Sequence, residues 1–369
     1  MKELQEHVAN LIDLAVQIQQ IPAPTFHEAR RANFIFNLFK KAGLSNIETD
    51  PQGNVFGRVE TTGPWKSKAP IVVSAHLDTV FPLESDLKVT QEPQRVHGPG
   101  IGDNSLGVAC LAVLPEILRD RQIDLERDLW LVANTGEEGM GNLEGMKAVC
   151  SRFKSEPKAY IILEGIGLGD IFHRGLAVSR YRITVDTPGG HSWSDYGSPS
   201  AIHELARLVS AFTSLNLPAN PRTSLNVGVI SGGTSINTIA SNAWLELDLR
   251  SEQAISLRKL VSEIEDLVVK ANQTNVTVHA SQVGKRPAGS LPANHWLVQL
   301  ASECLMDHGI KPVLRIGSTD ANYPLSQGFT AICLGLTTGG RAHSRDEFIH
   351  IPPLSQGIEA LVQLICAIK

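Results

Sequence analysis

Histidine and acidic residues recur in this chain at five short sites, each of which closely follows an apolar run or a glycine-rich turn. Two imidazoles and several carboxylates, with no cysteine among them, are the ligand set of a hydrolytic zinc site. The residue types and their positions therefore indicate a metal-dependent enzyme. The five sites are His76 with Asp78, Asp103, Glu137 with Glu138, Glu164, and His343.

Apolar runs of strand length lie just upstream of four of these sites. Such runs are typical of buried strands in an α/β sheet, and ligands of these folds bind at the carboxyl ends of the strands. We therefore expect the histidine and acidic side chains to meet at one edge of a single sheet. The runs comprise residues 71–75, 129–134, 160–163 and 331–336.

His76 and Asp78 are two residues apart at an expected strand end, so both side chains can leave the strand from one face. The Asp78 carboxylate can then hold one imidazole nitrogen while the other nitrogen binds a metal. Asp103 ends a glycine-rich segment just before an expected helix, where it is either a metal ligand or the helix N-cap. That segment, residues 98–104, lacks the glycine spacing of a dinucleotide site.

Glu137 and Glu138 are adjacent, so their side chains diverge and two neighbouring carboxylates can take different roles. One can bind a metal while the other handles the proton of a metal-bound water. The alternative is a solvated pair of loop acids. Glu164 and His343, taken singly, are equally compatible with ordinary surface or core positions.

The pattern of elements divides the chain between two folds. Alternating apolar strands and helices up to about residue 174, and again after Pro287, predict an α/β domain with a mixed, mostly parallel sheet flanked by helices. Between them, a half-exposed alternating strand near Val178 begins a β-α-β-β-α-β order typical of a ferredoxin-like unit. We expect one domain from residues 1–176 and 288–369, with a smaller domain of residues 177–287 inserted.

Helix signals give three local predictions. Residues 2–19 have the spacing of an amphipathic helix. Thr25 and Glu28 have the capping-box spacing, which predicts that a second helix starts there and runs to about Lys41. A third helix is expected near Ser105, and Pro115 inside it should kink or end that helix.

Composition limits the classes of function. The 369 residues, 42% hydrophobic and 19% charged, are typical of a soluble globular protein with two domains. A net charge of −5 gives no attraction to nucleic acid or to anionic membranes. We expect no signal peptide and no segment long enough to span a bilayer. Five cysteines without a C-x-x-C pair are interpreted as small buried residues, which is consistent with a reducing cytoplasm.

Taken together, the motifs resemble those of the dinuclear-zinc exopeptidases and deacylases, a family that includes carboxypeptidase G, peptidase T, acetylornithine deacetylase and aminoacylase. The resemblance covers essentially the whole chain, with the motifs in the family's order. The segments that carry it are residues 76–80 (HLDTV), 98–104 (GPGIGDN), 136–139 (GEEG), Glu164 and 343–347 (HSRDE).

The resemblance implies a role for each of these residues. Asp103 would bridge two divalent metal ions, zinc first, with cobalt or manganese as alternatives. Asp78 would orient His76, and Glu137 would be the general base that moves a proton from the bridging water to the leaving amine. The remaining ligands would be His76 and Glu164 for one ion, and Glu138 and His343 for the other.

The same resemblance implies that the inserted domain is a lid and dimerisation domain. His191 would reach the active site of the partner subunit in a homodimer, although a water-exposed turn histidine is the alternative. Asn237 also fits the family pattern, and Arg250 would clamp a substrate carboxylate unless it forms a surface ion pair with neighbouring acids. Asp320 would face the substrate or act only as a turn residue. Trp193, where the family has small residues, would narrow the site or pack at a dimer edge.

Two activities use this set of residues equally well. The first is an exopeptidase that trims short peptides in the cytoplasm, and the second is a deacylase that cleaves N-acyl amino acids. A non-catalytic binding protein on the same fold is a third hypothesis, for which loss of a ligand or of the base would be the signature. None of these residues is missing from the sequence.

Overall fold

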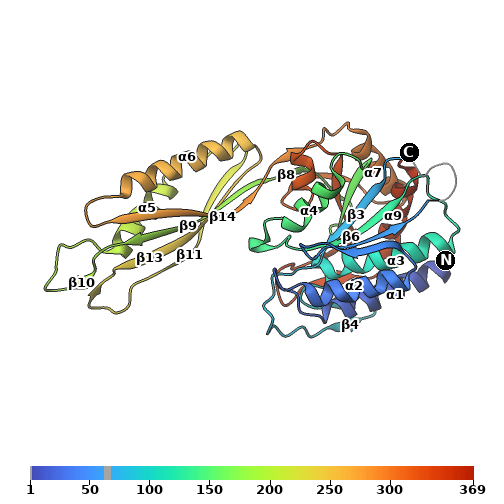
Figure 1. The fold of residues 1–369 in the computed structure, drawn as a ribbon, viewed down its shortest axis with the longest axis horizontal. Helices are drawn as coiled ribbons and strands as arrows, with labels where there is room; N and C mark the ends of the chain where they lie inside the picture. Colours follow the sequence, from blue (N-terminus) through green and yellow to red (C-terminus); the bar gives the residue numbers. More distant parts are fainter. Residues whose placement is uncertain (1, 62–67) are drawn as a thin grey trace. The chain divides into compact units, whose positions relative to one another are not determined.

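The computed structural model describes residues 2–61 and 68–369, which form two compact units. One unit comprises Met1–Gly175 with Gly289–Lys369, and the other comprises Leu176–Ala288. Figure 1 follows the chain through both units along the sequence colours. The expected boundaries, 176/177 and 287/288, lie one residue from these divisions.

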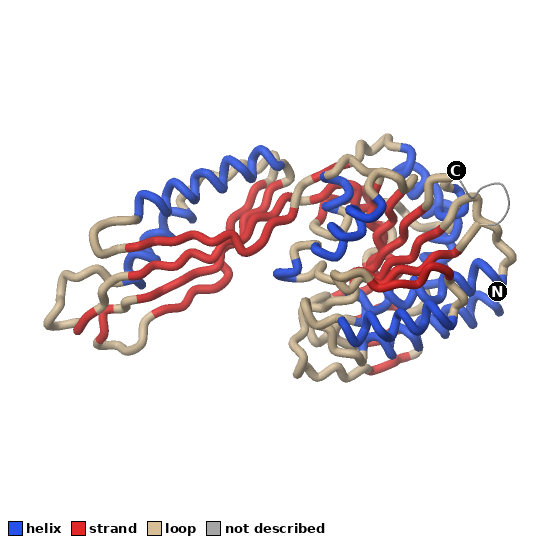
Figure 2. The backbone as a smooth tube through the Cα atoms, in the orientation of Figure 1, coloured by secondary structure: helices blue, strands red, loops and turns tan. Residues whose placement is uncertain are grey.

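The first unit contains a nine-stranded mixed sheet, shown as arrows in Figure 1 and in red in Figure 2. Its order is β1-β2-β6-β3-β7-β17-β8-β15, with β16 paired to β8. The four strands β6, β3, β7 and β17 are parallel neighbours, and antiparallel strands flank them. The predicted α/β fold is confirmed. The bounds are β1 Ser45–Thr49, β2 Val55–Val59, β3 Ile71–His76, β6 Leu129–Asn134, β7 Ala159–Ile166, β8 Asp170–Gly175, β15 Gly289–Ser290, β16 Val313–Gly317 and β17 Ala331–Thr337.

Every residue of β3, β6 and β17 is buried, because helices cover a sheet whose strands read as continuous apolar runs. Helix α3 packs on β3, β6 and β7, while α1 packs against α3 and α9 packs on β17. A small second sheet pairs four short strands in the order β18-β19-β5-β4. The helices are α1 Lys2–Gln19, α2 Ala29–Lys41, α3 Leu106–Asp120, α4 Glu144–Phe153, α7 Trp296–Asp307, α8 Asn322–Ser326 and α9 Leu354–Ala367, and the short strands are β4 Thr90–Glu92, β5 Arg95–His97, β18 Gly339–Gly340 and β19 Phe348–His350.

Two of the local helix predictions need correction. Helix α2 begins at Ala29, and no side chain caps it, so Thr25 and Glu28 do not form a capping box. Helix α3 continues through Pro115 to Asp120, so of the two predicted outcomes, a kink or an end, the end is wrong. Its residues 106–115 are all buried, and packing of this face outweighs the hydrogen bond that proline removes.

One segment among the described residues is long and apolar enough to cross a membrane, contrary to expectation. It is Ile101–Asp120, and 89% of its most apolar stretch is buried inside the protein. Asp103 and Asn104 within it have non-helical backbone angles, so the regular helix is only the 15 residues of α3.

The second unit is a two-layer β-α-β-β-α-β fold, as predicted. Its sheet order, β11-β13-β9-β14, is antiparallel throughout and is that of a ferredoxin-like unit. Tyr181, Ile183 and Val185 of β9 face the core, which α5 and α6 complete. A separate ribbon pairs β10 with β12 and was not foreseen. The bounds are β9 Ala177–Asp186, β10 Gly190–His191, α5 Ala201–Thr213, β11 Thr223–Gly232, β12 Thr238–Ile239, β13 Asn242–Ser251, α6 Ala254–Ala271 and β14 Thr277–Arg286.

Candidate metal centre

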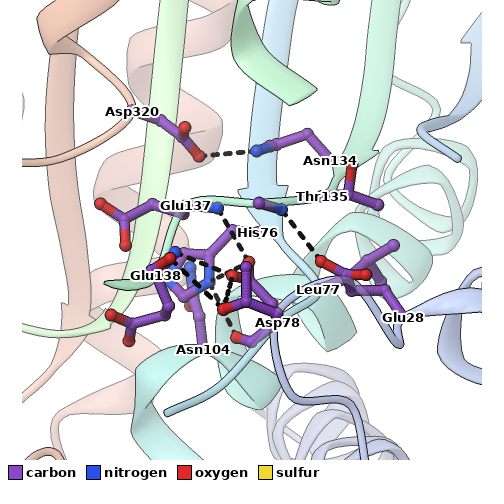
Figure 3. A network of polar contacts seen from close by, with 12 residues as sticks. Glu28, His76, Leu77, Asp78, Asn104, Asn134, Thr135, Glu137, Glu138 and Asp320 are labelled. Carbon is purple, nitrogen blue, oxygen red and sulfur yellow. Dashed lines mark hydrogen bonds and ion pairs between the residues drawn. The ribbon is translucent and has the colours of Figure 1, made fainter. Parts of the chain in front are cut away.

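Strand ends of the first unit bring the predicted residues together. His76 is the last residue of β3 and is in register with Asn134, the last residue of the parallel strand β6. The turn after Asn134 carries Glu137 and Glu138 to the same edge, where Figure 3 shows them beside His76. Parallel strands end at one edge of a sheet, so burial of these strands fixes where the polar side chains emerge.

Asp103 lies between the two histidines, and each of its carboxylate oxygens faces a different ring. Asp103 Oδ1 is 3.1 Å from Nε2 of His76, and Oδ2 is 3.1 Å from Nε2 of His343. Asp103 thus lies between the two histidines that the resemblance assigns to different ions. The interpretation of Asp103 as a helix N-cap does not fit, because α3 begins at Leu106 after Ser105.

Each histidine is accompanied by a second carboxylate. Glu164 Oε2 is 3.5 Å from Nε2 of His76, and Glu138 Oε1 is 3.0 Å from Nε2 of His343. Two groups of donor atoms result, and within each group the atoms lie within 4.8 Å of one another. Asp103 belongs to both, and the histidine and carboxylate donors of this set are chemically suited to divalent metal ions. The groups are His76 with Asp103 and Glu164, and Asp103 with Glu138 and His343.

Asp78 is fully buried beneath the site and is the acceptor of a small network, drawn in Figure 3. Its Oδ1 accepts from the backbone N–H of Glu137 at 3.0 Å, and Oδ2 accepts from that of Glu138 at 2.8 Å. The Thr25 hydroxyl donates to Asp78 Oδ2 at 2.9 Å. Nδ1 of His76 lies 3.4 Å from Oδ1 and 3.0 Å from the Asp78 carbonyl oxygen, which leaves Nε2 directed at the other ligands.

Thr25 and Glu28 therefore serve this site instead of capping a helix. Glu28 Oε1 accepts from the backbone N–H of Gly136, in the turn just before Glu137. Sequence analysis did not predict these two contacts, because a capping box was enough to explain the spacing of Thr25 and Glu28. Only their distant partners, more than 50 residues away in the chain, distinguish the two roles.

Glu347 holds the loop that carries Asp103. This carboxylate is fully buried and accepts from the backbone N–H groups of Gly100 at 3.0 Å, Gly102 at 2.7 Å and Asp103 at 2.8 Å. Sequence reasoning gave Glu347 no role, although it belongs to the motif that begins at His343. Its partners are 244 or more residues away in sequence, which no local pattern reveals.

Asn104 fixes the strand on both sides of Glu164. Its Nδ2 donates to the Leu163 carbonyl at 2.7 Å, and its Oδ1 accepts from the Gly165 N–H at 3.0 Å. A side chain at Gly165 would place its Cβ 2.2 Å from the Gly102 carbonyl oxygen. Glycine at this position thus allows the loop and the strand to approach closely enough to share the site.

The electrostatics of the cluster favour the charged forms of the two histidines and of Asp103, but not that of Glu164. Burial alone would lower the pKa of His76, but Glu164, Asp103 and Asp78 raise it well above 6.5. Hydrogen bonds to Asp103 and Glu138 raise the pKa of His343 to about 10. Burial would raise the pKa of Asp103, but the two histidines bring it far below its usual value. Burial raises the pKa of Glu164 to about 7.

Glu137 is 5% exposed, and a carboxylate oxygen of it lies within 4.8 Å of donor atoms of His76 and Glu138. Its position beside the two candidate ion sites suits the role of a general base. Asp320 is fully buried, and its Oδ2 accepts from Asn134 Nδ2 at 2.7 Å. That carboxylate has no surface open to a substrate here, so the prediction that it faces the substrate gains no support.

The second unit contains the other predicted residues in two places. His191 on β10 and Asn237 next to β12 are neighbours, since the Ser192 N–H donates to the Asn237 carbonyl at 3.0 Å. The His191 ring is exposed, and its Nδ1 accepts from the N–H of Trp193 at 3.2 Å. Trp193 is itself 86% exposed.

Arg250 lies near the C-terminal end of β13 and forms hydrogen bonds with Asp248 of the same strand. Its Nε and Nη2 donate to Asp248 at 3.0 and 2.9 Å. The observed contact is an ion pair with a neighbouring acid, which was the predicted alternative to a clamp on a substrate carboxylate. In the register of the sheet, Arg250 pairs with Val178 of β9, whereas Asn242, eight residues earlier on β13, pairs with Asp186.

The comparison with protein families settles the class of the chain. The model of peptidase family M20/M25/M40 matches residues 72–367. The chain belongs to this family. The resemblance inferred from the motifs is thereby confirmed, and the M20/M25/M40 chain is a metal-dependent hydrolase of amide bonds.

Curated relatives of this M20/M25/M40 chain include both deacylases and a peptidase. It is 24% identical to succinyl-diaminopimelate desuccinylase of Corynebacterium glutamicum, over 91% of this chain and 90% of that protein. It is 26% identical to acetylornithine deacetylase of Proteus mirabilis, over 90% and 88%. The cytosol non-specific dipeptidase of Escherichia coli is 24% identical over 70% of this chain and 57% of that protein.

Solved structures of peptidases share the fold over nearly the full length. A tripeptidase of Staphylococcus aureus superposes with a TM-score of 0.82 at 19% identity, covering 98% of both chains. The aminopeptidase PepT of Bacillus cereus gives 0.79 at 19% identity, again over 98% of both chains. At these identities the structural similarity establishes the fold of the chain and does not identify its substrate.

Proposed function

We propose that this chain is a dinuclear metal-dependent exopeptidase that hydrolyses short peptides. The observation that carries the proposal is the position of Asp103, whose two oxygens face His76 and His343 at 3.1 Å each. One ion would be held by His76, Asp103 and Glu164, and the other by Asp103, Glu138 and His343. Zinc is the first candidate for both, and cobalt or manganese are alternatives, because histidine and carboxylate donors suit all three.

The chemistry that two such ions supply is Lewis acidity, which polarises the scissile carbonyl and makes water acidic near neutral pH. Glu137 takes the proton from the attacking water and delivers it to the nitrogen of the leaving amine. Asp78 keeps His76 in one orientation through its Nδ1 and fixes the backbone of Glu137 and Glu138. Glu347 fixes the position of Asp103 by accepting from its backbone N–H. Asn104 fixes that of Glu164 by accepting from the backbone N–H of the next residue, Gly165.

The second unit is proposed to be a lid and dimerisation domain. The exposed ring of His191 supports this role, since it is free to donate to a developing oxyanion in the partner's site within a homodimer. Asn237, adjacent to it, would contact the same substrate. Arg250 would act on a substrate carboxylate only by exchanging its present partner, Asp248.

A deacylase that cleaves N-acyl amino acids is the second candidate. The relatives that align with about 90% of this chain include a desuccinylase and a deacetylase. Every residue assigned above would act in the same way on an N-acyl amide. A cytoplasmic location is proposed for either activity, supported by the cytosolic dipeptidase among the relatives and by four buried free cysteines.

The experiment that tests the proposal measures metal content and substrate preference on one sample. The chain, reconstituted separately with zinc, cobalt and manganese, is assayed on di- and tripeptides, on the same peptides with blocked termini, and on N-acetyl and N-succinyl amino acids. The proposal expects at least two ions per chain, two of them in the cluster around Asp103, and cleavage of free peptides that a chelator abolishes. Cleavage of N-acyl amino acids alone would favour the second candidate. Fewer than two ions at full activity would overturn the dinuclear assignment.

A further inference from the structure

A pocket of about 480 Å³ lies between α1 and α3 at the outside of the first unit. Its walls come from both helices and from the end of α2. Three of its side chains form a group whose donor atoms lie within 4.8 Å of one another, and none of them belongs to the cluster around Asp103. They are His7 of α1, with Glu116 and Asp120 of α3.

The three donors converge on one point. Glu116 and Asp120 are four residues apart, so they project from the same face of α3, and His7 approaches them from α1. One donor atom from each of the three lies within 4.8 Å of the others. In a tetrahedral zinc site with bonds of ~2.1 Å, donor atoms are roughly 3.4 Å apart. Nε2 of His7 and Oδ2 of Asp120 are already 3.6 Å apart.

His7 supplies an independent reason to expect a ligand. It is 4% exposed, and its Nε2 is buried without a hydrogen-bond partner among the residues that the structure describes. The nearest acidic atom recorded, Oδ2 of Asp120 at 3.6 Å, is beyond hydrogen-bond distance. A buried polar atom left without a partner is unfavourable, and coordination of a metal ion would satisfy it.

The surroundings of the acids are arranged as outer contacts of a metal site usually are. Asn10 Nδ2 donates to Glu116 Oε2 at 3.0 Å, and Arg119 Nε lies 3.6 Å from Asp120 Oδ1. The hydrogen bond from Asn10 uses one oxygen of Glu116 and orients the other, whereas the Arg119 contact is an ion pair only. The pocket is lined by three acids (Glu6, Glu116, Asp120) and two bases (Lys41, Arg119), which leaves a charge of −1 to offset part of the ion's charge.

We propose that His7, Glu116 and Asp120 bind a divalent transition-metal ion such as Zn²⁺, with water completing its coordination. This site is separate from the catalytic cluster. Asp120 is the last residue of α3, whereas Asp103 precedes its first turn, so the two lie ~25 Å apart along the chain's helical path. The ion would tie α1 to α3, the helix whose first turn follows the Asp103 loop. The proposal does not depend on the substrate of the enzyme.

The test counts ions in the full-length enzyme by equilibrium dialysis against Zn²⁺, followed by elemental analysis. His7→Gln and Glu116→Gln should each bind one ion fewer than the wild type, with peptide or N-acyl hydrolysis unchanged. Asp13→Asn is the matched control, because Asp13 is an exposed acid on the same helix, α1, and does not line this pocket. It should bind as many ions as the wild type. Added Zn²⁺ should also raise the melting temperature of the wild type by more than that of His7→Gln.

Two results would overturn the proposal. One is an unchanged number of bound ions in both His7→Gln and Glu116→Gln. The other is the absence of an anomalous peak beside His7 Nε2 in zinc-edge diffraction from wild-type crystals, a measurement that needs no variant. If either glutamine variant fails to fold, Asp120→Asn takes its place in the dialysis, and the diffraction result decides alone if all three fail. Because hydrolysis and catalytic ions are measured on the same samples, failure here is distinguishable from failure of the proposed function.

Discussion

Asp78 accepts a hydrogen bond of 3.0 Å from the backbone N–H of Glu137. The same buried carboxylate accepts from Glu138 and lies 3.4 Å from Nδ1 of His76. One side chain therefore fixes the candidate base and one ligand for each of the two proposed ions. Because Asp78 is fully buried, it acts by positioning these residues.

Asp78→Asn should weaken metal binding while leaving the chain folded. The amide NH₂ of asparagine would face the N–H groups of Glu137 or Glu138, and a donor facing a donor leaves both without an acceptor. Loss of such a supporting partner typically lowers metal affinity roughly 10–100-fold. Competition with a fluorescent chelator measures this change, and Asp86→Asn, an exposed acid, is the control. Equal affinities of both variants and the wild type would contradict the role given to Asp78.

Glu137→Gln should retain its metal ions and lose turnover. The amide keeps the shape of the side chain and leaves the backbone N–H bond to Asp78 intact, but it cannot accept the proton of water. General-base catalysis contributes roughly 10²–10⁴-fold, so kcat should fall by about that factor with little change in KM. Glu144→Gln, an exposed acid on α4, should behave as the wild type. Full activity of Glu137→Gln would remove Glu137 from the mechanism.

Glu347→Gln should disturb the Asp103 loop. Three backbone N–H groups converge on this carboxylate, and glutamine replaces one acceptor oxygen with a donor. An unsatisfied buried donor costs about 1–3 kcal/mol, so both the free energy of unfolding and the metal content should decrease. Chemical denaturation and elemental analysis measure the two effects. Asp346→Asn, whose side chain is 74% exposed, is the adjacent control. A stable Glu347→Gln variant with its full complement of ions would show that the loop holds without this acceptor.

The sequence indicated candidate ligands because several of them lie in or just after strands that had to be buried. His76 ends β3 and Glu164 lies in β7, and the apolar runs of both strands are visible without any structure. The β-α-β-β-α-β order of the second unit was equally visible, because its strands alternate with a period of two. Local pattern and global fold agree in these elements.

The supporting residues could not be predicted in the same way. Thr25 and Glu28 match a capping box in spacing, yet their oxygens bond to Asp78 and Gly136. Hydroxyl and carboxylate oxygens bond equally well to a local or a distant partner, and only the folded chain selects between the two. The same holds for Glu347, whose three donors lie at the other end of the sequence.

Metal loading at pH 7 should release at least two protons per chain. In the metal-free protein the pKa of His343 is raised to about 10 and that of His76 well above 6.5, so both rings are protonated at pH 7. A metal binds the neutral imidazole, and both protons must leave. The apparent affinity for each ion should therefore increase with pH, by roughly 10-fold per unit near neutrality, because each ion displaces the proton of one histidine. Calorimetry in two buffers of different ionisation enthalpy counts the protons. Release of less than one, or an affinity independent of pH, would show that these histidines are not both ligands.

Mixing two inactive variants tests whether His191 acts in the partner subunit. In a homodimer of that kind, His191→Ala has an intact metal site but supplies no histidine, whereas Glu137→Gln supplies the histidine to its partner. After reversible dissociation and mixing, half of the dimers would be mixed, each with one complete site, so roughly a quarter of wild-type activity should return. Remixing either variant with itself is the control and should restore nothing. If the His191→Ala variant alone is fully active, or if the mixture remains as inactive as its parts, the exposed ring of His191 has no role across a dimer.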